Sequence, residues 1–288
     1  MSTPKSHHYV PRAYLRRFVA EDGFLRIFDV ERSQIRRQRP EKVMKIDGYY
    51  RQEWAPAGID PNILEKRAGE IEGNGLAAMD RLCFSPEKIS GEEAADLCAF
   101  LEFQRVRVPR QAAWAAELAR TFLLRTMGPE LRDELARNRL QVTVLDPARF
   151  DFMRTMLGKI HPWMERMNWE VVEAAPGSAF ITTDSPVTFV NRAFPPHAEA
   201  GIGLAGTVAL FPLSSRKLLF MTHPEAAFLP PDGRLRRPKE SDMSRVPLTH
   251  GGVFDREKVR QTNWYMAHTA HHLCVAESEA ALSEAFSV

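Results

Sequence analysis

The chain has 288 residues, of which 44% are hydrophobic and 26% charged. This is the balance of an ordinary globular protein, and it excludes a disordered chain. Thirty-nine Lys and Arg against 37 Asp and Glu leave a net charge of +2, so any basic surface that binds a partner must be local. The three cysteines, Cys83, Cys98 and Cys274, are far apart in the sequence, which argues against a disulfide framework and against a zinc finger.

No targeting or membrane segment is evident in the sequence. The opening residues MSTPKSHHYVPR lack the apolar stretch of a signal peptide. No stretch reaches the roughly 18 uncharged apolar residues that a membrane-spanning helix needs. We therefore expect a cytoplasmic protein that makes no membrane contact.

The N-terminal region is predicted to form a strand, a helix and a hairpin. Pro11 disfavours helical backbone at the residue before it, so HHYVP is expected to be extended. In the segment that follows, Tyr14 and Phe18 are spaced to share one helical face. Residues 23–40 alternate apolar and polar side chains and reverse near 31–33, which is typical of a hairpin.

Residues from about 60 to 160 are expected to be helical. Asp60 and Pro61 resemble a helix start, and Ser90 followed by Glu93 is a capping-box pattern. A long segment from Pro109 to about 137 is interrupted at 128–129 by Gly-Pro, and a further helix is expected from about 147 to 160.

After residue 165 the apolar period changes towards two, which predicts strands. WEVVEAA, AFITTDSPVTFV, GTVALFPL and KLLFMTH are the clearest runs, followed by a helix over DREKVRQTNWYMAHTA and a last strand over HHLCVAES. We expect an α+β fold, with a helical layer and a mixed or antiparallel sheet that the N-terminal strand joins. A single domain is predicted over 1–288, its sheet-rich part comprising about 165–288 with 6–40.

The adjacent His7 and His8 are the first candidates for chemistry. On a strand their side chains point to opposite faces, so only one can face a given pocket. A histidine can act as an acid, a base or a metal ligand near neutral pH. The alternative is that both are ordinary residues of an N-terminal strand.

Two carboxylates and an amide–guanidinium pair lie in the predicted helices. Glu65 and Glu72 are seven residues apart, so they share a helix face at roughly 10 Å along the axis. At that spacing each would meet its own partner, such as His8 and Arg107, unless both are solvated. Gln104 and Arg107 are three apart and form one polar patch, suited either to an anion or to an inter-helix ion pair.

Asp184 interrupts the β-rich run FITTDSPVTF. It either presents a carboxylate to a cleft or forms an Asx turn. His268, His271 and His272 are the densest histidine cluster. His268 and His272 have the i,i+4 spacing of a metal pair if the helix continues that far. The flanking residues indicate that the helix ends near there, so core or surface histidines are the favoured interpretation.

Several segments in order, SHHYVPRAYLRRF, LEKRAGEIE, QRVRVP, FITTDSPV, FPLSSRKLLF and TNWYMAHTA, resemble a large bacterial family of uncharacterised proteins, domain-of-unknown-function family 4238. In the related pattern an Asn often stands at the position of Ser185, so no role is assigned to that side chain. The resemblance suggests a defence or toxin setting that no residue here shows. It also implies that the family's recurring polar positions fall on His7, His8, Glu65, Glu72, Gln104, Arg107, Asp184 and Asn263.

Three functions are consistent with these residues. The first is a metal-dependent phosphodiesterase or nuclease, because HHYVP is similar to the strand that opens many HNH nucleases. The next histidine after His8 is His161, however, so the metal-binding histidine of that pattern is missing. A site for a small or nucleotide-like anion without a metal is the second function. The third is a ligand-binding or regulatory protein whose polar residues form a structural network, which a tight pair of Arg107 and Glu72 without an open cavity would favour.

We favour a hydrolase of phosphate esters, such as a nuclease. In this hypothesis His8 is the base, and His7 supports it or lies on the opposite face of the strand. Arg107 stabilises the negative charge of the phosphate. Asp184 and Glu72 would hold a divalent metal (Mg, Mn or Zn). Gln104 and Asn263 would position the substrate. A nucleic acid or nucleotide-like anion would bind through Arg105, Arg107 and Arg110. There is no P-loop and no GxSxG motif in the sequence.

Overall fold

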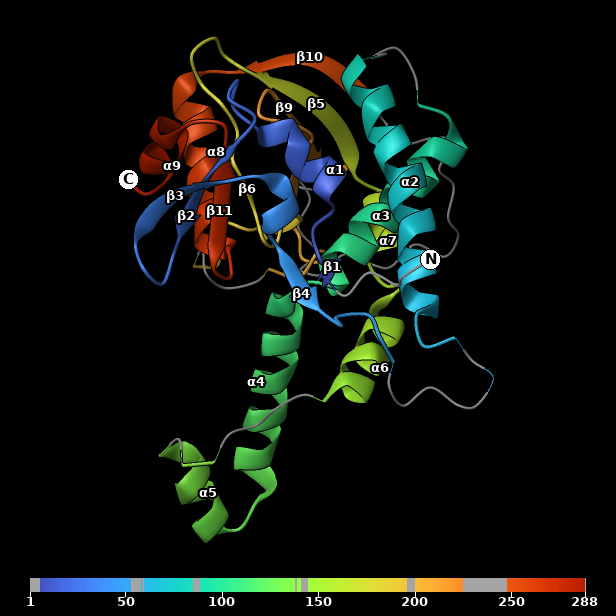
Figure 1. Ribbon diagram of the computed structural model, residues 1–288, viewed down its shortest axis with the longest axis vertical. Coiled ribbons are helices and arrows are strands. Elements are labelled where there is room, and N and C mark those ends of the chain that lie inside the picture. The colour runs from blue at the N-terminus through green and yellow to red at the C-terminus, as the bar shows by residue number, and fades with distance from the viewer. Residues whose placement is uncertain are drawn as a thin grey trace.

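The structure is a computed structural model, and it has the predicted α+β fold. It describes residues 6–52, 58, 60–84, 89–137, 139–140, 145–195, 200–224 and 248–287. The described strands form three sheets, and they pack beside a layer of helices in the upper body of Figure 1. No helix in these residues is long and apolar enough to cross a membrane.

The two histidines begin the chain's first strand, β1 (Ser6–His8), which pairs antiparallel with β4 (Lys45–Asp47). Within the described residues these two strands form a sheet of their own. The prediction that the N-terminal strand joins the main sheet is therefore wrong. β1 is short because Pro11 has no backbone N–H to extend a ladder and the chain turns directly into a helix.

That helix, α1 (Arg12–Leu15), continues into the short 3-10 helix η1 (Arg16–Phe18). Its Tyr14 is 1% exposed. The Tyr14 hydroxyl lies 2.7 Å from the Thr182 hydroxyl and donates to the Pro212 carbonyl at 2.9 Å. Because these two residues belong to different sheets, one buried phenol joins the N-terminal segment to both.

The helical layer forms as predicted, although its first helix begins at Ile63 and not at Pro61. α2 and α3 pack against each other along much of their length, and α3 begins with the capping box in which the Ser90 side chain accepts from the Glu93 N–H and the Glu93 carboxylate accepts from the Ser90 N–H. The helices are α2 (Ile63–Phe84), α3 (Gly91–Val106), α4 (Pro109–Thr126), α5 (Pro129–Ala136), α6 (Asp146–Met156) and α7 (His161–Met164).

The two larger sheets have different topologies. The first, in the order β10-β5-β9-β8-β7, is mixed, because β10 runs parallel to β5, whereas the second, β3-β2-β11-β6, is antiparallel. The strands are β2 (Leu25–Asp29), β3 (Gln34–Gln38), β5 (Asn168–Ala174), β6 (Thr182–Thr183), β7 (Thr188–Val190), β8 (Val208–Pro212), β9 (Lys217–Thr222), β10 (Leu248–Phe254) and β11 (Leu273–Ala276).

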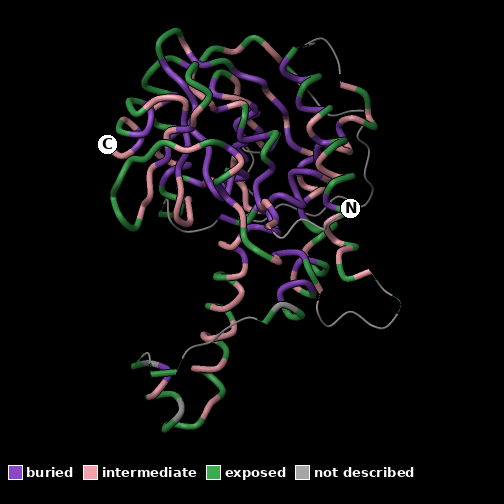
Figure 2. Tube along the Cα trace, viewed as in Figure 1, coloured by how far each residue is buried: buried purple, intermediate pink, exposed green. Residues whose placement is uncertain are grey.

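Two apolar clusters make up the core of the described residues. The larger joins α1, α2 and α3 to the five-stranded sheet, and the smaller lies beneath α8 (Arg256–Thr269) and α9 (Glu279–Ala285). Figure 2 shows the buried residues concentrated in the body, whereas α4 and α5 project from it as an arm of mostly intermediate and exposed residues. A second short 3-10 helix, η2 (Pro40–Lys42), precedes β4.

The contact between α2 and α3 requires a glycine. A Cβ atom built at Gly75 would lie 2.2 Å from the Phe100 Cβ. We predict that Gly75→Ala lowers the free energy of unfolding by about 1–3 kcal/mol, because a methyl group must be forced between packed helices. Chemical denaturation measures this change.

Gly73→Ala is the matched control, because Gly73 is exposed on the same helix and its added Cβ would have no neighbour within 4 Å. It should raise the free energy of unfolding by up to about 1 kcal/mol, through helix propensity alone. Equal effects of the two substitutions would contradict the proposed steric cause.

Candidate functional site

His7 and His8 face opposite sides of β1, as the sequence predicts. His7 is 2% exposed. Its Nδ1 accepts a hydrogen bond from the Tyr50 backbone N–H at 2.9 Å, and its ring stacks on that of Tyr50 with centroids 5.6 Å apart. Because Nδ1 accepts, Nε2 carries the proton of the neutral ring. That atom lies 3.7 Å from the Glu65 carboxylate.

His8 has the opposite arrangement of its ring nitrogens. It is half-buried and bonds to the Pro40 carbonyl, while its Nε2 is buried without a hydrogen-bond partner among the described residues. A carbonyl only accepts, so Nδ1 carries the proton and Nε2 has a free lone pair. Burial is the main cause that lowers the pKa of His8, with Lys45 and Arg12 adding to it. His8 is therefore a neutral imidazole that can accept a proton.

Arg107 is 0% exposed and lies at the end of α3. Its Nη1 lies 2.5 Å from the Glu72 carboxylate, and its Nε donates to the Gln104 amide oxygen at 3.0 Å. The Gln104 amide nitrogen in turn donates to the Tyr9 carbonyl at 3.0 Å. This chain of contacts, which we call the Arg107 network, links α2, α3 and the residue after β1.

A polar cavity of about 360 Å³ opens between β1, α1 and α2. Carboxylate, imidazole, phenol and guanidinium groups thus meet in one place. The tight pair of Arg107 and Glu72 therefore borders an open cavity rather than a closed core. The lining residues are Ser6, His8, Pro11, Arg12, Ala13, Arg16, Tyr50, Glu65, Ala68, Gly69 and Glu72.

The charged groups of the polar cavity differ in their ion pairs and in the shifts of their pKa values. Burial raises the pKa of Glu65, and the nearby Glu72 raises it further, against the opposing effects of His7 and Arg107. Arg16 pairs with Glu41 at 2.9 Å. Arg12 is exposed and forms no ion pair with any residue that the structure describes. The cavity therefore offers a free cation beside a carboxyl group that holds its proton more tightly than usual.

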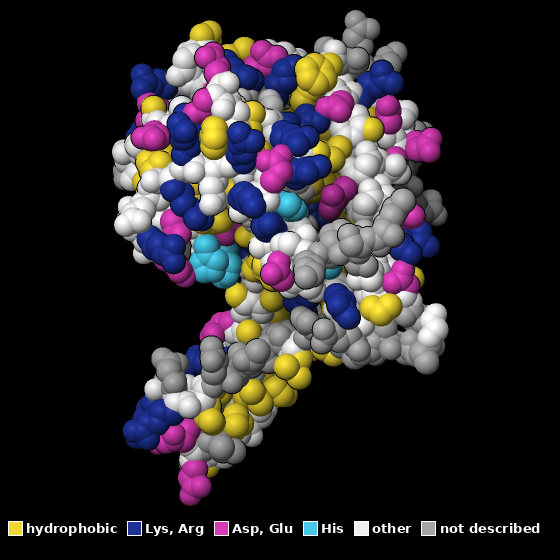
Figure 3. Space-filling model, viewed as in Figure 1, with side chains coloured by type: hydrophobic (Ala, Val, Ile, Leu, Met, Phe, Trp, Pro, Cys, Tyr) yellow, Lys and Arg dark blue, Asp and Glu magenta, His cyan; other side chains and the backbone are white. Residues whose placement is uncertain are grey.

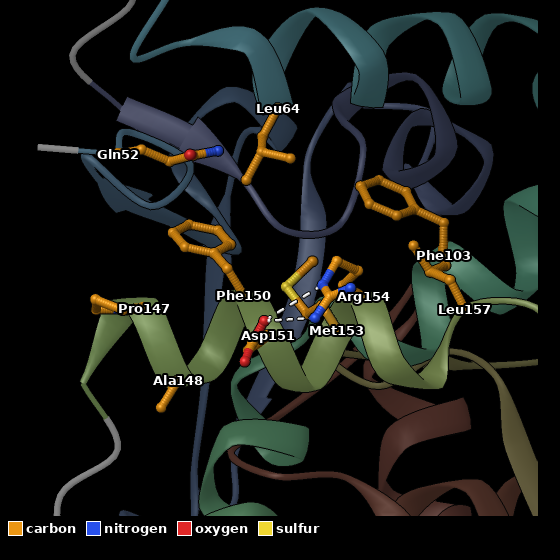
Figure 4. A pocket seen from close by; sticks show the side chains of 10 residues that line it. All are labelled: Gln52, Leu64, Phe103, Pro147, Ala148, Phe150, Asp151, Met153, Arg154 and Leu157. Atoms are coloured by element: carbon orange, nitrogen blue, oxygen red, sulfur yellow. Dashed lines mark hydrogen bonds and ion pairs between the residues drawn. The ribbon is translucent and has the colours of Figure 1, made fainter. Parts of the chain in front are cut away.

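A larger cavity, of about 660 Å³, lies between α6 and the start of α2. Leu64, Phe103, Phe150 and Met153 supply most of its apolar lining (Figure 4). Its charged residues Asp151 and Arg154 bond to each other at 3.0 Å. We take the polar cavity as the candidate functional site, because perturbed titratable groups, and not volume alone, are typical of such sites.

Asp184 lies outside both cavities. It is 2% exposed, and its carboxylate accepts the backbone N–H groups of His271, His272 and Leu273 at 2.8, 2.7 and 3.1 Å. Asp184 and Glu72 therefore have different partners, because the Asp184 oxygens are bonded at the start of β11 while Glu72 bonds to Arg107. A metal shared by these two carboxylates stays a prediction.

Asn263, Gln104 and Arg107 are also committed to structural contacts. The Asn263 amide accepts from the Ile181 N–H at 3.0 Å and donates to the Ala179 carbonyl at 2.8 Å. Gln104 is 1% exposed and bonded as described above. The proposed roles of Gln104 and Asn263 in positioning a substrate are not supported by this geometry. Arg107 does not itself line the polar cavity, and it borders the cavity through Glu72 and Tyr50.

The other predicted residues are dispersed. α8 ends at Thr269, so His268 and His272 do not share a helix face, and His272 instead lies 3.1 Å from the Glu31 carboxylate. Arg105 is 5% exposed and donates to the Val187 carbonyl at 3.0 Å. Arg105 and Arg107 are buried and Arg110 is half-buried, so none of the three is exposed, and nucleic-acid binding through them stays a prediction.

No group of three or more His, Cys, Asp or Glu side chains in the described ranges is arranged to hold a metal ion. The divalent metal stays a prediction. Sequence reasoning missed Arg12 and Tyr50. Arg12 lies within the quoted HHYVPR segment and could have been found there, whereas nothing in the local sequence places Tyr50 beside His7.

A family model for proteins of unknown function, DUF4238, matches residues 6–280. The chain belongs to the DUF4238 family. The match includes every residue of the polar cavity and of the Arg107 network. No curated protein and no solved structure matches the chain, so the function of this DUF4238 protein has to be argued from its site.

The Arg107 network should contribute strongly to stability. We predict that Arg107→Ala lowers the free energy of unfolding by about 3–5 kcal/mol, because it leaves the Glu72 and Gln104 oxygens without their buried donor. Denaturant unfolding of the variant measures this.

Arg154→Ala is the control, since Arg154 pairs with Asp151 on an exposed helix face. Its effect should stay within about 0.5 kcal/mol. A loss below about 1 kcal/mol for Arg107→Ala would show that the network does not hold α2 and α3 together.

Proposed function

We propose that this protein is a phosphoesterase that cleaves phosphodiesters by general acid–base catalysis in the polar cavity. One observation carries the proposal. A neutral imidazole with a free Nε2, His8, and a carboxyl group whose pKa is raised, Glu65, line the same cavity as the free guanidinium of Arg12. Burial disfavours the charged form of both groups, which favours a base without its proton and an acid with one.

The step needs one proton acceptor and one proton donor. His8 Nε2 takes the proton of an attacking hydroxyl as its oxygen bonds to phosphorus. Glu65 gives its proton to the leaving oxygen as the second P–O bond breaks, so the leaving group departs as a neutral alcohol. His8 then returns its proton, and Glu65 regains one, through solvent. Acid–base catalysis of this kind contributes about 10²–10⁴-fold in rate.

Arg12 and Glu72 have supporting roles in this proposal. The guanidinium of Arg12 has no competing carboxylate among the described residues, so it can bond to the phosphate oxygens on which negative charge develops. Glu72 is held by Arg107 and raises the pKa of the nearby Glu65. It therefore favours the protonated form of Glu65 without touching the substrate, and we regard it as a positioning residue.

Part of the polar set does form a structural network, which was the alternative function. Arg107, Gln104, Asp184 and Asn263 bond to backbone or to one another. His8 Nε2 and Arg12 are not engaged in this way. A protein that only binds an anion would retain Arg12 but have no use for His8, and the next experiment separates the two functions.

His8→Ala should lower kcat about 10²–10⁴-fold, because no base remains to take the proton of the nucleophile. The substrates are bis(4-nitrophenyl) phosphate, where water attacks, and uridine 3′-(4-nitrophenyl phosphate), where the ribose hydroxyl can attack. Release of 4-nitrophenol measures both reactions.

His268→Ala is the control, because His268 bonds to the Trp264 carbonyl outside the cavity. It should leave kcat unchanged. Each assay is repeated in EDTA, which should not alter the rate. Wild-type protein that cleaves neither substrate, with or without Mg²⁺ or Mn²⁺, would refute the proposed activity, and activity that depends on added metal would refute the metal-free mechanism.

The effect of Glu65→Gln on the cleavage rate should depend on the leaving group of the substrate. A 4-nitrophenolate leaves without protonation, so its release should slow less than about 10-fold, whereas cleavage of uridine 3′-(methyl phosphate) should slow about 10²-fold or more. The reason is that an alkoxide needs the proton that Gln cannot give. Rates of the two esters, measured by absorbance and by chromatography, give the ratio.

The pH profile provides the second readout for Glu65. Activity needs His8 without its proton and Glu65 with it, so the rate should rise with pH as His8 deprotonates below its usual 6.5 and fall as Glu65 ionises above its usual 4.5. The methyl ester should therefore show a bell-shaped profile on the acidic side of neutral. In Glu65→Gln the alkaline fall should disappear, and an unchanged profile would contradict the role of Glu65 as acid.

A further inference from the structure

The positive charge of the chain is concentrated in its N-terminal segment. Residues 12–45 contain ten Lys and Arg and five Asp and Glu, a net +5, and because the whole chain carries +2 the remainder carries −3. Lys and Arg side chains gather over α1 and the neighbouring hairpin strands in Figure 3. We call the exposed Lys and Arg side chains of residues 12–45 the basic surface. The polar cavity lies at the edge of this surface.

Several cations of the basic surface are available to a partner. Arg12, Arg36 and Arg39 are exposed and make no ion pair within the described residues. Arg39 lies over the Phe24 ring with its guanidinium carbon 5.3 Å from the centroid. Such flat cationic groups bind phosphates and also stack on nucleobases. Arg37 already pairs with Asp22 at 3.5 Å.

The basic surface is continuous with the polar cavity. Arg39 directly precedes Pro40, whose carbonyl bonds to His8. Arg16, which lines the cavity, pairs with Glu41 of the same segment. A polyanion on Arg39 would therefore be led towards Arg12 and His8. A small phosphate ester would have no use for these outer arginines.

We infer that the substrate is an RNA strand, an inference that rests on the proposed function. RNA supplies its own nucleophile, because the ribose 2′-hydroxyl lies next to the phosphorus that it attacks and needs only a base. His8 takes the 2′-hydroxyl proton, the 2′ oxygen bonds to phosphorus, and the bond to the 5′ oxygen breaks as Glu65 protonates it. The products are a 2′,3′-cyclic phosphate and a 5′-hydroxyl end, so atoms and protons balance.

The test uses a fluorescein-labelled 12-nucleotide RNA and the DNA of the same sequence with the full-length protein. Wild-type protein should cut the RNA in EDTA and leave a 2′,3′-cyclic phosphate, identified by mass spectrometry. The DNA should bind but stay intact. A single 2′-deoxy substitution in the RNA should block cleavage at that position alone.

Binding is measured separately by fluorescence anisotropy, with His8→Ala protein so that the RNA stays whole. Adding Arg36→Glu and Arg39→Glu should weaken binding at least 10-fold and lower the salt slope by about 1.4, from two phosphate contacts at about 0.7 each. The matched control is Arg139→Glu, after α5, combined with Arg154→Glu, on α6. It makes the same change of net charge away from the basic surface and should leave binding unchanged. Melting temperatures verify folding of each variant.

The outcomes separate the two proposals. Cleavage of the chromogenic diesters without cleavage of RNA, or equal cleavage of RNA and DNA, would overturn the RNA inference and leave the phosphoesterase. Equal loss of RNA binding in both charge-reversal variants would contradict the role of the basic surface in binding RNA. A protein that binds phosphatidylglycerol vesicles but does not bind RNA would also contradict that role. Cleavage of no diester of any kind would overturn the proposed function itself.

Discussion

The buried charge of Arg107 is the interaction on which the site depends. A guanidinium removed from water costs several kcal/mol unless its donors are paired. Here Glu72 supplies the countercharge, Gln104 accepts two of its donors, and Tyr49 donates to its carbonyl at 2.6 Å. These partners come from α2, α3 and the segment after β4. Satisfying one cation therefore fixes the relative positions of the elements that enclose the polar cavity.

The groups assigned to the proposed reaction are those that the Arg107 network leaves without a hydrogen-bond partner. The short strand β1 is anchored on one face, where His7 accepts from the Tyr50 N–H, and it presents His8 on the other. The neighbouring histidines are thus predicted to hold their protons on different nitrogens, although they share a strand. Desolvation lowers the pKa of His8 and raises that of Glu65. One burial effect therefore prepares both a base and an acid.

The sequence predicted what local periodicity and helix spacing determine. The capping box at Ser90 and the opposite faces of the two histidines follow from such rules. The contact of Glu72 with Arg107 was one of the partnerships that the helix spacing left open. Asp184 and Asn263 were misjudged because a buried polar residue that satisfies distant backbone groups has the same sequence signal as a catalytic one. β10 was missed because its Gly-Gly pair weakens the strand pattern and its partner β5 is far away in the chain. The position of Tyr50 beside His7 could not be predicted for the same reason, because the two residues are far apart in the chain.

The most direct test of this account is the tautomer of each histidine, read from long-range ¹H–¹⁵N NMR correlations and assigned with His7→Gln and His8→Gln proteins. At pH 7 we predict a proton on Nε2 of His7, and a neutral His8 with its proton on Nδ1 that titrates below 6.5. A His8 that carries its proton on Nε2, or on both nitrogens, would contradict the account. The base of the proposed reaction would then be absent.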